Sequence, residues 1–246
     1  MLKIVGRLVD LVLVPRCSGC HKLMDTRGIT ICKECYDRFE DAKTAYCDFC
    51  GMEASLCICV PQRLLMSGCS DYRKITFYKT DKEASAFRNM IFSIKRKYNL
   101  VLMRFFMQEL SDLHADRDLQ DPLVSYAPRT HKAYRKNGYD QAKLLAKFYA
   151  EENGYEFAKV LRRRFFHREK EQKLLNYSQR AANMRGAFAI VHPKNLVGRD
   201  IILVDDVVTS GSTVAECVSM LYAAGAKTDA VRSIAYTYKK NKYKKD

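Results

Sequence analysis

Residues 201–213 read IILVDDVVTSGST, and this stretch decides the fold class. Its first part, Ile201–Val204, is apolar, rich in β-branched residues and too short for an independent helix. Such a run is typical of a parallel strand that is buried on both faces. Asp205 and Asp206 follow at the carboxyl end, where open α/β sheets bind ligands. Because a helical pattern begins at Val214, we predict an α/β fold with a parallel sheet flanked by helices.

The turn between the two acids and that helix consists of small residues that carry hydroxyl groups. Backbone N–H groups and hydroxyls at the start of a helix form a site for a phosphate. The neighbouring carboxylates can accept hydrogen bonds from ribose hydroxyls or hold a metal ion. The stretch therefore predicts a ligand that carries both hydroxyls and a phosphate. The alternative is an ordinary strand–turn–helix unit whose acids cap the turn.

The same stretch resembles the signature of the type I phosphoribosyltransferases, which bind phosphoribosyl pyrophosphate (PRPP) with Mg2+. The resemblance implies that Asp205 and Asp206 are the catalytic pair and hold the 2′- and 3′-hydroxyls of the ribose. It also implies a phosphoribosyltransferase-like sheet and a loop that surrounds the 5′-phosphate. The residues implied in PRPP binding here are Val207, Val208, Thr209, Ser210, Gly211, Ser212 and Thr213.

The chain is strongly basic. Its 246 residues, enough for one large domain or two small ones, include 43 Lys and Arg against 28 Asp and Glu, a net charge of +15. That excess favours polyanionic partners, namely nucleic acid, an anionic membrane surface or phosphorylated small molecules.

No segment approaches the roughly 18 uninterrupted apolar residues of a membrane span. The N-terminal stretch MLKIVGRLVDLVLVP is interrupted by Lys3, Arg7 and Asp10, and it lacks the features of a signal peptide. It is interpreted as an amphipathic helix that packs on the protein, with a contact to a membrane surface as the alternative. We expect a cytoplasmic protein, either free or peripheral to the inner membrane.

Cysteines crowd the N-terminal part of the chain. Ten occur, nine of them before residue 70. Eight form close pairs with three C-x-x-C spacings and one C-x-C spacing, namely Cys17/Cys20, Cys32/Cys35, Cys47/Cys50 and Cys57/Cys59. Two such pairs complete a tetrahedral zinc shell, so the eight predict two closed, structural zinc sites. A disulfide scaffold or a redox pair are the alternatives, but no export signal is visible and four pairs favour metal.

The sequence leaves the assignment of these pairs open. Sequential pairing would join the first two pairs at one zinc and the last two at the other. Cross-braced pairing would join the first pair with the third and the second with the fourth. Cys69 and Cys217 stand alone, and we expect them to be buried thiols rather than ligands.

Residues 70–115 are interpreted as helical. Phe87, Ile91 and Ile94 recur at spacings of four and three, which places them on one face of a helix. The basic cluster Lys95–Lys97 is attributed to the end of that helix, where cations are favoured. We expect this region to connect the cysteine-rich module to the main domain and to form part of its hood.

The main domain is predicted to begin with a strand at Leu123–Ala127. A basic loop from Arg129 to Gly138 follows, and a helix begins near Asp140, which can act as its cap. At the end of a parallel strand such a loop suits a pyrophosphate, and in isolation it would be a solvated charged loop. Arg129 and Arg135 are therefore added to the PRPP-binding candidates.

Further elements follow from the pattern. Strands are predicted near 156–161, 188–191 and 229–236, and a helix is predicted to end at Gly225. The long basic stretch before residue 188 is interpreted as a lid. The expected organisation is a zinc-binding module with an N-terminal helix (1–70), a helical linker or hood (71–120), a phosphoribosyltransferase-like domain (121–238) and a basic tail (239–246).

Together, the cysteine-rich head, the R-K-N-G-Y-D-Q segment and the terminal PRPP motif resemble the ComF family over nearly the whole chain, in particular its ComFC-type competence proteins. The pattern R-x-G-F-N-Q of that family corresponds to Arg135, Gly138, Tyr139, Asp140 and Gln141, with an acid in place of the amide at 140. A second matching segment contains Gln172, Arg180, Asn183, Arg185 and Phe188. The resemblance implies a zinc finger, PRPP binding with Mg2+, and a role in moving single-stranded DNA during transformation.

Three functions are compatible with these residues. The first is a PRPP-binding protein that handles single-stranded DNA, with Lys and Arg of residues 129–173 and the tail as DNA contacts. Other competence proteins at the inner face of the membrane are expected as its partners. The second is a metabolic transferase that moves phosphoribose to a base or an amine, although no base-binding hood motif is recognisable. The third is a non-enzymatic regulator that senses PRPP.

Overall fold

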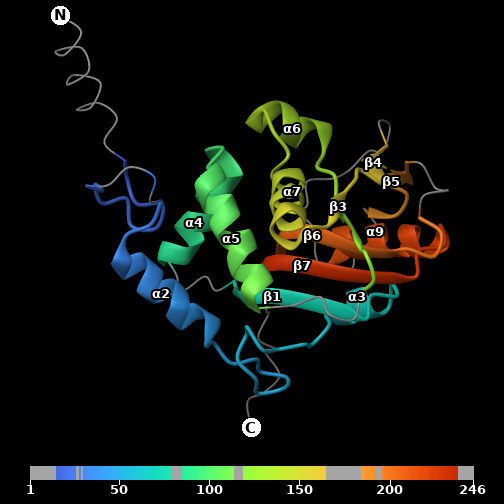
Figure 1. Ribbon diagram of the computed structural model, residues 1–246, viewed down its shortest axis with the longest axis horizontal. Helices are drawn as coiled ribbons and strands as arrows, with labels where there is room; N and C mark the ends of the chain where they lie inside the picture. The colour runs from blue at the N-terminus through green and yellow to red at the C-terminus, as the bar shows by residue number, and fades with distance from the viewer. Residues whose placement is uncertain are drawn as a thin grey trace, which may run out of the picture.

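The computed structural model describes residues 15–25, 28, 30–78, 85–113, 119–164, 184–191 and 196–237. At its centre lies a five-stranded sheet in which every neighbouring pair is parallel, in the order β1-β7-β6-β2-β3 (Figure 1). Its strands are β1 (Asp71–Phe77), β2 (Leu123–Tyr126), β3 (Glu156–Phe157), β6 (Asp200–Val208) and β7 (Thr228–Tyr236). The predicted α/β class is thereby confirmed.

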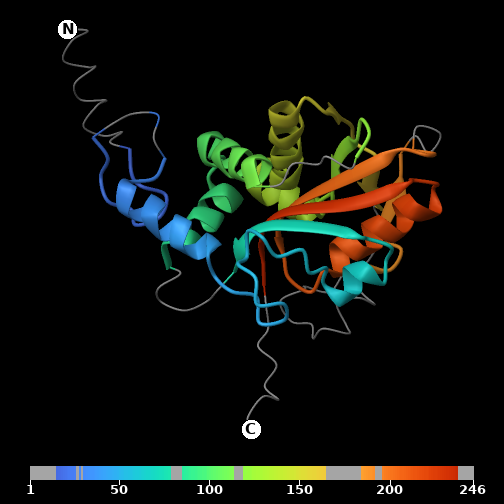
Figure 2. The ribbon, with the colours of Figure 1, turned by 60° about the horizontal axis from the view of Figure 1, so that its bottom comes forward.

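Helices cover both faces of the sheet, as Figure 2 shows. Side chains alternate along β6, so Ile202 and Val204 belong to one buried cluster while Ile201 and Leu203 belong to another. On the first face lie α4 (Ser85–Arg96), α5 (Leu100–Leu113) and α7 (Gln141–Asn153), and on the second lies α9 (Ser212–Ala223). This double burial explains why β6 is almost entirely apolar up to its two acids.

The cysteine-rich module extends from the sheet around α2 (Lys33–Lys43), the blue helix of Figure 1. Phe39 of α2 packs against Phe87 of α4 and Phe106 of α5, with ring centroids 6.1 and 5.8 Å apart. The short helix α3 (Gln62–Leu65) then leads from the module into β1. An aromatic cluster therefore attaches the module to the helices that cover the sheet.

The helical interpretation of residues 70–115 is wrong for its beginning. Asp71–Phe77 forms the edge strand β1, paired with β7, and so β1 rather than the predicted strand at 123–127 is the first strand of the sheet. The charged residues of β1 make the sequence unlike that of a buried strand. Their charges are accommodated by partners that are distant in the sequence. Lys74 is buried and donates to the carbonyl oxygen of Cys57 (3.0 Å). Asp71 pairs with the buried Arg232 of β7.

Two further elements differ from the sequence interpretation. The basic loop after β2 contains a helix, α6 (His131–Asn137), capped by the Thr130 side chain, which accepts from Ala133 N–H. The strand expected near 156–161 is divided into β3 and β4 (Leu161–Arg163). β4 pairs antiparallel with β5 (Phe188–Ile190) in a separate small sheet.

Most other elements were predicted correctly. The helices α4, α7 and α9 and the final strand occupy the expected stretches, and Asp140 caps α7 by accepting from Lys143 N–H. Among the helices that the described residues form, none combines the length and apolar character needed to cross a bilayer. The N-terminal stretch 1–14, the lid segment with Gln172, Arg180 and Asn183, and the tail 239–246 lie outside the described residues.

Candidate PRPP site and metal centres

The two acids of the motif lie in β6, and each carboxylate accepts a hydrogen bond from the backbone N–H of the next residue. Asp205 Oδ1 accepts the N–H of Asp206 (2.9 Å), and Asp206 Oδ1 accepts the N–H of Val207 (2.6 Å). Asp206 is buried and Asp205 is partly exposed. The strand therefore presents both carboxylates at its carboxyl end, in orientations that backbone hydrogen bonds hold.

Two side chains from other elements converge on Asp206. The Gln141 amide, at the start of α7, donates to Asp206 Oδ2. Lys95 Nζ, near the end of α4, lies 3.3 Å from Asp206 Oδ1. Gln141 belongs to the segment that resembles the ComF pattern, which by itself predicts no role for this residue. The role of Lys95 was missed, because a basic helix end is sufficiently explained by the helix dipole when only the sequence is considered.

The two neighbouring carboxyl groups have different protonation behaviour. Burial raises the pKa of Asp205, and the negative charge of Asp206 raises it further, to about 7. Burial also raises the pKa of Asp206, but the Lys95 charge and the Gln141 hydrogen bond outweigh burial and hold that pKa below its ordinary value. In the free protein, Asp206 is therefore a fixed negative charge, and Asp205 shares a proton with solvent near neutral pH.

Arg129 supplies a second positive charge near the acids. Its backbone N–H donates to Asp140 Oδ2 (3.1 Å), and its charge lowers the pKa of both Asp205 and Asp206. Arg129 Nη1 is buried, and no described residue accepts its hydrogen bond. A buried donor without a partner is costly, so this guanidinium is prepared to bind an anion. Asp140, where the family pattern has an amide, fixes the backbone of Arg129 and caps α7.

Arg135, the other basic candidate, lies in the last turn of α6 and is exposed. No described contact brings it to the two acids. Its predicted role in binding pyrophosphate stays a prediction.

The predicted phosphate loop connects β6 to α9. Gly211 is the N-cap of α9 with a left-handed backbone (φ 72°), a conformation that glycine adopts at little cost. Among the described residues no side chain caps this helix, so its first N–H groups can bind a ligand. Ser210 Oγ and Ser212 Oγ lie 3.0 Å apart, and Thr209 is exposed. The side chains of Val207 and Val208 are buried in the core, which leaves only their backbone for ligand contacts.

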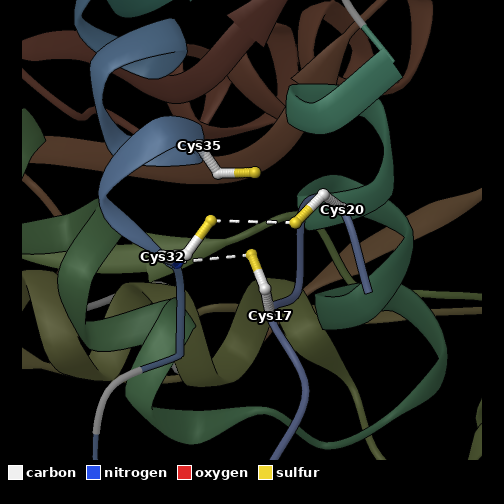
Figure 3. Close-up of side chains that lie close together, drawn as sticks. All are labelled: Cys17, Cys20, Cys32 and Cys35. Carbon is white, nitrogen blue, oxygen red and sulfur yellow. Dashed lines mark hydrogen bonds between the residues drawn. The ribbon is translucent and has the colours of Figure 1, made fainter. Parts of the chain in front are cut away.

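The eight paired cysteines form two clusters. Cys17, Cys20, Cys32 and Cys35 make one, and Cys47, Cys50, Cys57 and Cys59 make the other. Sequential pairing is thus the one that the fold adopts, and the cross-braced alternative is wrong. Figure 3 shows the four sulfur atoms of the first cluster facing one another. Cys69 and Cys217 are buried and belong to neither cluster, as predicted.

The geometry of both clusters fits a zinc ion. Four sulfurs at about 2.3 Å from a tetrahedral zinc lie about 3.8 Å from one another. The sulfurs of Cys20 and Cys32 are 3.7 Å apart, and so are those of Cys50 and Cys57. Burial raises the pKa of Cys17, but backbone N–H groups of Cys20, Cys32 and Gly19 outweigh it and lower the pKa to about 6. These donors favour the thiolate, which is the form that binds metal.

Comparison with known proteins gives relatives for part of the chain. No protein-family model matches it. It is 31% identical over 152 residues to the DNA utilization protein YhgH of Shigella flexneri, a match that covers 59% of this chain and 63% of that protein. The corresponding protein of Escherichia coli strain K12 is 32% identical over 141 residues, covering 55% and 59%. The chain thus matches about three fifths of the length of these curated relatives.

Solved structures give weaker matches. A glutamine PRPP amidotransferase from B. subtilis, complexed with ADP and GMP, matches 53% of this chain and 25% of its own, with 20% identity and a TM-score of 0.38. The allosteric regulatory enzyme of purine biosynthesis matches the same shares with a TM-score of 0.36.

The resemblance to the ComF family that the sequence motifs predicted is confirmed by the curated relatives.

Proposed function

We propose that this chain binds PRPP together with Mg2+ and handles single-stranded DNA during natural transformation. The observation that carries the proposal is the arrangement at the end of β6. Four residues separate the two carboxylates from a helix start at Gly211 that has no side-chain cap, and Arg129 Nη1 is buried nearby without an acceptor among the described residues. Hydroxyl acceptors, a phosphate cradle and an anion-binding guanidinium are the three features that PRPP requires.

Each group then has a role in binding. Asp205 and Asp206 accept the ribose hydroxyls, and the loop 209–213 binds the 5′-phosphate through its backbone N–H groups. Arg129 and Lys95 balance the negative charge of the pyrophosphate, because both already influence the two acids electrostatically. Carboxylate oxygens are hard ligands that suit Mg2+, which would enter with PRPP and offset the charge on its phosphates.

Single-stranded DNA is the proposed macromolecular partner. The net charge of +15 favours a polyanion, and the matched relatives are named DNA utilization proteins. Helix α6 carries the consecutive residues Tyr134, Arg135 and Lys136, and all three are exposed. Exposed aromatic rings next to cations are what proteins use to stack bases and follow a single-stranded backbone. We therefore place DNA contacts on α6, next to the PRPP site that begins at Arg129.

Each of the two cysteine clusters is proposed to hold one structural zinc ion. Four thiolates leave no open coordination position, so zinc would connect the loops of the module and take no part in chemistry. The protein is proposed to act in the cytoplasm, at the inner face of the inner membrane, with other competence proteins as partners.

A calorimetric titration with PRPP and Mg2+, in the absence and presence of an oligonucleotide, tests the two ligands together. We expect saturable PRPP binding. We also expect a changed PRPP affinity when the oligonucleotide is present, because α6, the proposed DNA contact, follows directly after the PRPP candidate Arg129 and Thr130. Incubation of PRPP with a panel of nucleobases separates the metabolic alternative. Release of pyrophosphate with any base would replace the DNA-handling role with that of a metabolic transferase.

A further inference from the structure

A cavity lies between α3 and α9. Ser212 of its lining also belongs to the loop 209–213, whereas the other lining residues take no part in the proposed PRPP and DNA contacts. The volume of the cavity is about 370 Å3, within the range of pockets that bind small molecules. Helix α9 lines it with Ser212, Glu216 and Ser219, which recur at spacings of four and three and so form one face of the helix. Gln62, Arg63 and Met66 line it from the side of α3.

Arg185 completes the wall of this cavity, and its position is fixed by a contact to α9. The N–H of Gly186 donates to Glu216 Oε1 (2.7 Å), which holds the turn that carries Arg185 against the helix. Glu216 is the one acid among the described lining residues, and it accepts this backbone hydrogen bond. Arg63 and Arg185 are the basic residues among the described lining residues.

The chemistry of these groups indicates a particular class of ligand. Guanidinium groups bind phosphate in bidentate fashion, and serine hydroxyls add donors. Gln62 offers an amide, which pairs well with the edge of an adenine base. Met66 is 81% exposed at the rim, and its thioether is a flexible apolar surface suited to an aromatic ring. A sugar phosphate would bind the guanidinium groups and the serine hydroxyls, but it would leave Gln62 and Met66 without a function.

We propose that this cavity binds a mononucleotide, with its phosphate at Arg63 and Arg185 and its base against Met66 and Gln62. The proposal does not depend on PRPP or DNA binding. It concerns a site separate from the two acids, which lie in β6 and do not line the cavity.

The chain contains no tryptophan, so a single introduced one is a specific reporter. Met66→Trp places an indole at the rim, where it can stack on a bound base. Phe49→Trp is the matched control, because Phe49 lies between Cys47 and Cys50, outside the cavity lining, and is 84% exposed. Fluorescence is followed during titration with AMP, ribose 5-phosphate, inorganic phosphate and a short oligonucleotide. We expect saturable quenching of the Met66→Trp protein by AMP, at least tenfold weaker binding of the two ligands without a base, and no saturable response in the control.

Two further variants locate the bound nucleotide. Arg63→Ala should weaken AMP binding at least tenfold, and Ser219→Glu, at an exposed position that should not affect folding, should do the same by adding a negative charge. Asp206→Asn should leave AMP binding unchanged. The proposal is overturned if AMP gives no saturable signal, if Ser219→Glu has no effect, if Asp206→Asn abolishes the signal, or if only the oligonucleotide responds. Loss of PRPP binding in Asp206→Asn with AMP binding intact would separate this site from the PRPP site.

Discussion

Lys95 Nζ lies 3.3 Å from Asp206 Oδ1, and this contact joins the end of α4 to the end of β6. The lysine comes from the helical region between the cysteine-rich module and the main domain. It lowers the pKa of Asp206 and also reduces the rise in the pKa of Asp205. A segment outside the strand–loop–helix motif therefore controls the charge of the proposed PRPP site.

Replacing Lys95 by methionine should make PRPP binding more sensitive to acid. Without the lysine charge, the pKa of Asp206 rises, and a protonated carboxyl loses an acceptor for the ribose hydroxyls. One unit of pKa corresponds to about 1.4 kcal/mol, so we expect affinity at pH 6 relative to pH 8 to fall by up to about tenfold more than in the wild type. Calorimetry at both pH values measures this. Lys97→Met, an exposed neighbour, is the control, and equal pH profiles for both variants would refute the role of Lys95.

How far the sequence could predict this site depends on how many residues separate the two partners of each contact along the chain. The acids, the Gly211 turn and α9 are consecutive in the chain, so a local pattern was enough to find them. Lys95 and Arg129, whose Nη1 has no acceptor among the described residues, reach the acids only because α4 and the end of β2 lie beside β6 in the fold. No spacing rule predicts such contacts between distant elements.

The missed strand β1 has a similar explanation. The whole stretch 70–115 is interpreted as helical from the spacing of its later apolar residues. In the fold, Lys74 of β1 is buried against the carbonyl of Cys57, and Asp71 pairs with Arg232 across the sheet. Buried charges follow tertiary partners rather than local periodicity. Likewise, the cysteine spacings predicted two metal sites, and only the fold distinguished sequential from cross-braced pairing.

Binding of PRPP should release a proton from Asp205. In the free protein the pKa of this carboxyl is raised to about 7 by burial and by Asp206, whereas hydroxyl donors and Mg2+ favour its ionised form. Affinity should therefore increase as the pH rises through 7. Calorimetry at pH 6.5 in two buffers of different ionisation enthalpy counts the released protons. Asp205→Asn should release fewer protons than the wild type, and an equal number would contradict this assignment.

The raised pKa of Asp205 also predicts how the stability of the protein depends on pH. The native protein keeps the Asp205 proton in a range where an unfolded chain, with an ordinary Asp pKa of about 3.9, has already lost it. The contribution of this carboxyl to the free energy of unfolding should thus fall as the pH rises from about 4 to about 7. Chemical denaturation of the wild type and Asp205→Asn should show a smaller decline for the variant across this window.

Gly19→Ala should empty the first cysteine cluster selectively. A methyl group at this position would meet Cys35 Sγ at 2.7 Å, so the sulfur would be displaced from its three partners. We expect zinc content, measured by mass spectrometry, to fall from two ions per chain to one. Cys69→Ala, which alters a buried thiol outside both clusters, should retain two. Full zinc content in Gly19→Ala would contradict the proposed first site.

Single-stranded DNA binding should weaken steeply with salt. Each phosphate contact contributes about 0.7 to the slope of log affinity against log salt concentration, and Lys136→Ala should reduce the slope by about that amount. Lys33→Ala, on α2 and 88% exposed, should leave the slope unchanged. Fluorescence anisotropy with a labelled oligonucleotide measures both slopes. A salt-independent affinity would argue against the DNA role.

The most direct test of the account is the PRPP/Mg2+ binding isotherm of Asp205→Ala/Asp206→Ala beside that of the wild type. The two carboxylates at the end of β6 are proposed to hold the ribose, and neither contacts a cysteine cluster. We predict one PRPP per wild-type chain, no measurable binding to the double variant, and unchanged zinc content in both. Binding of PRPP to the folded double variant with wild-type affinity would contradict the central claim.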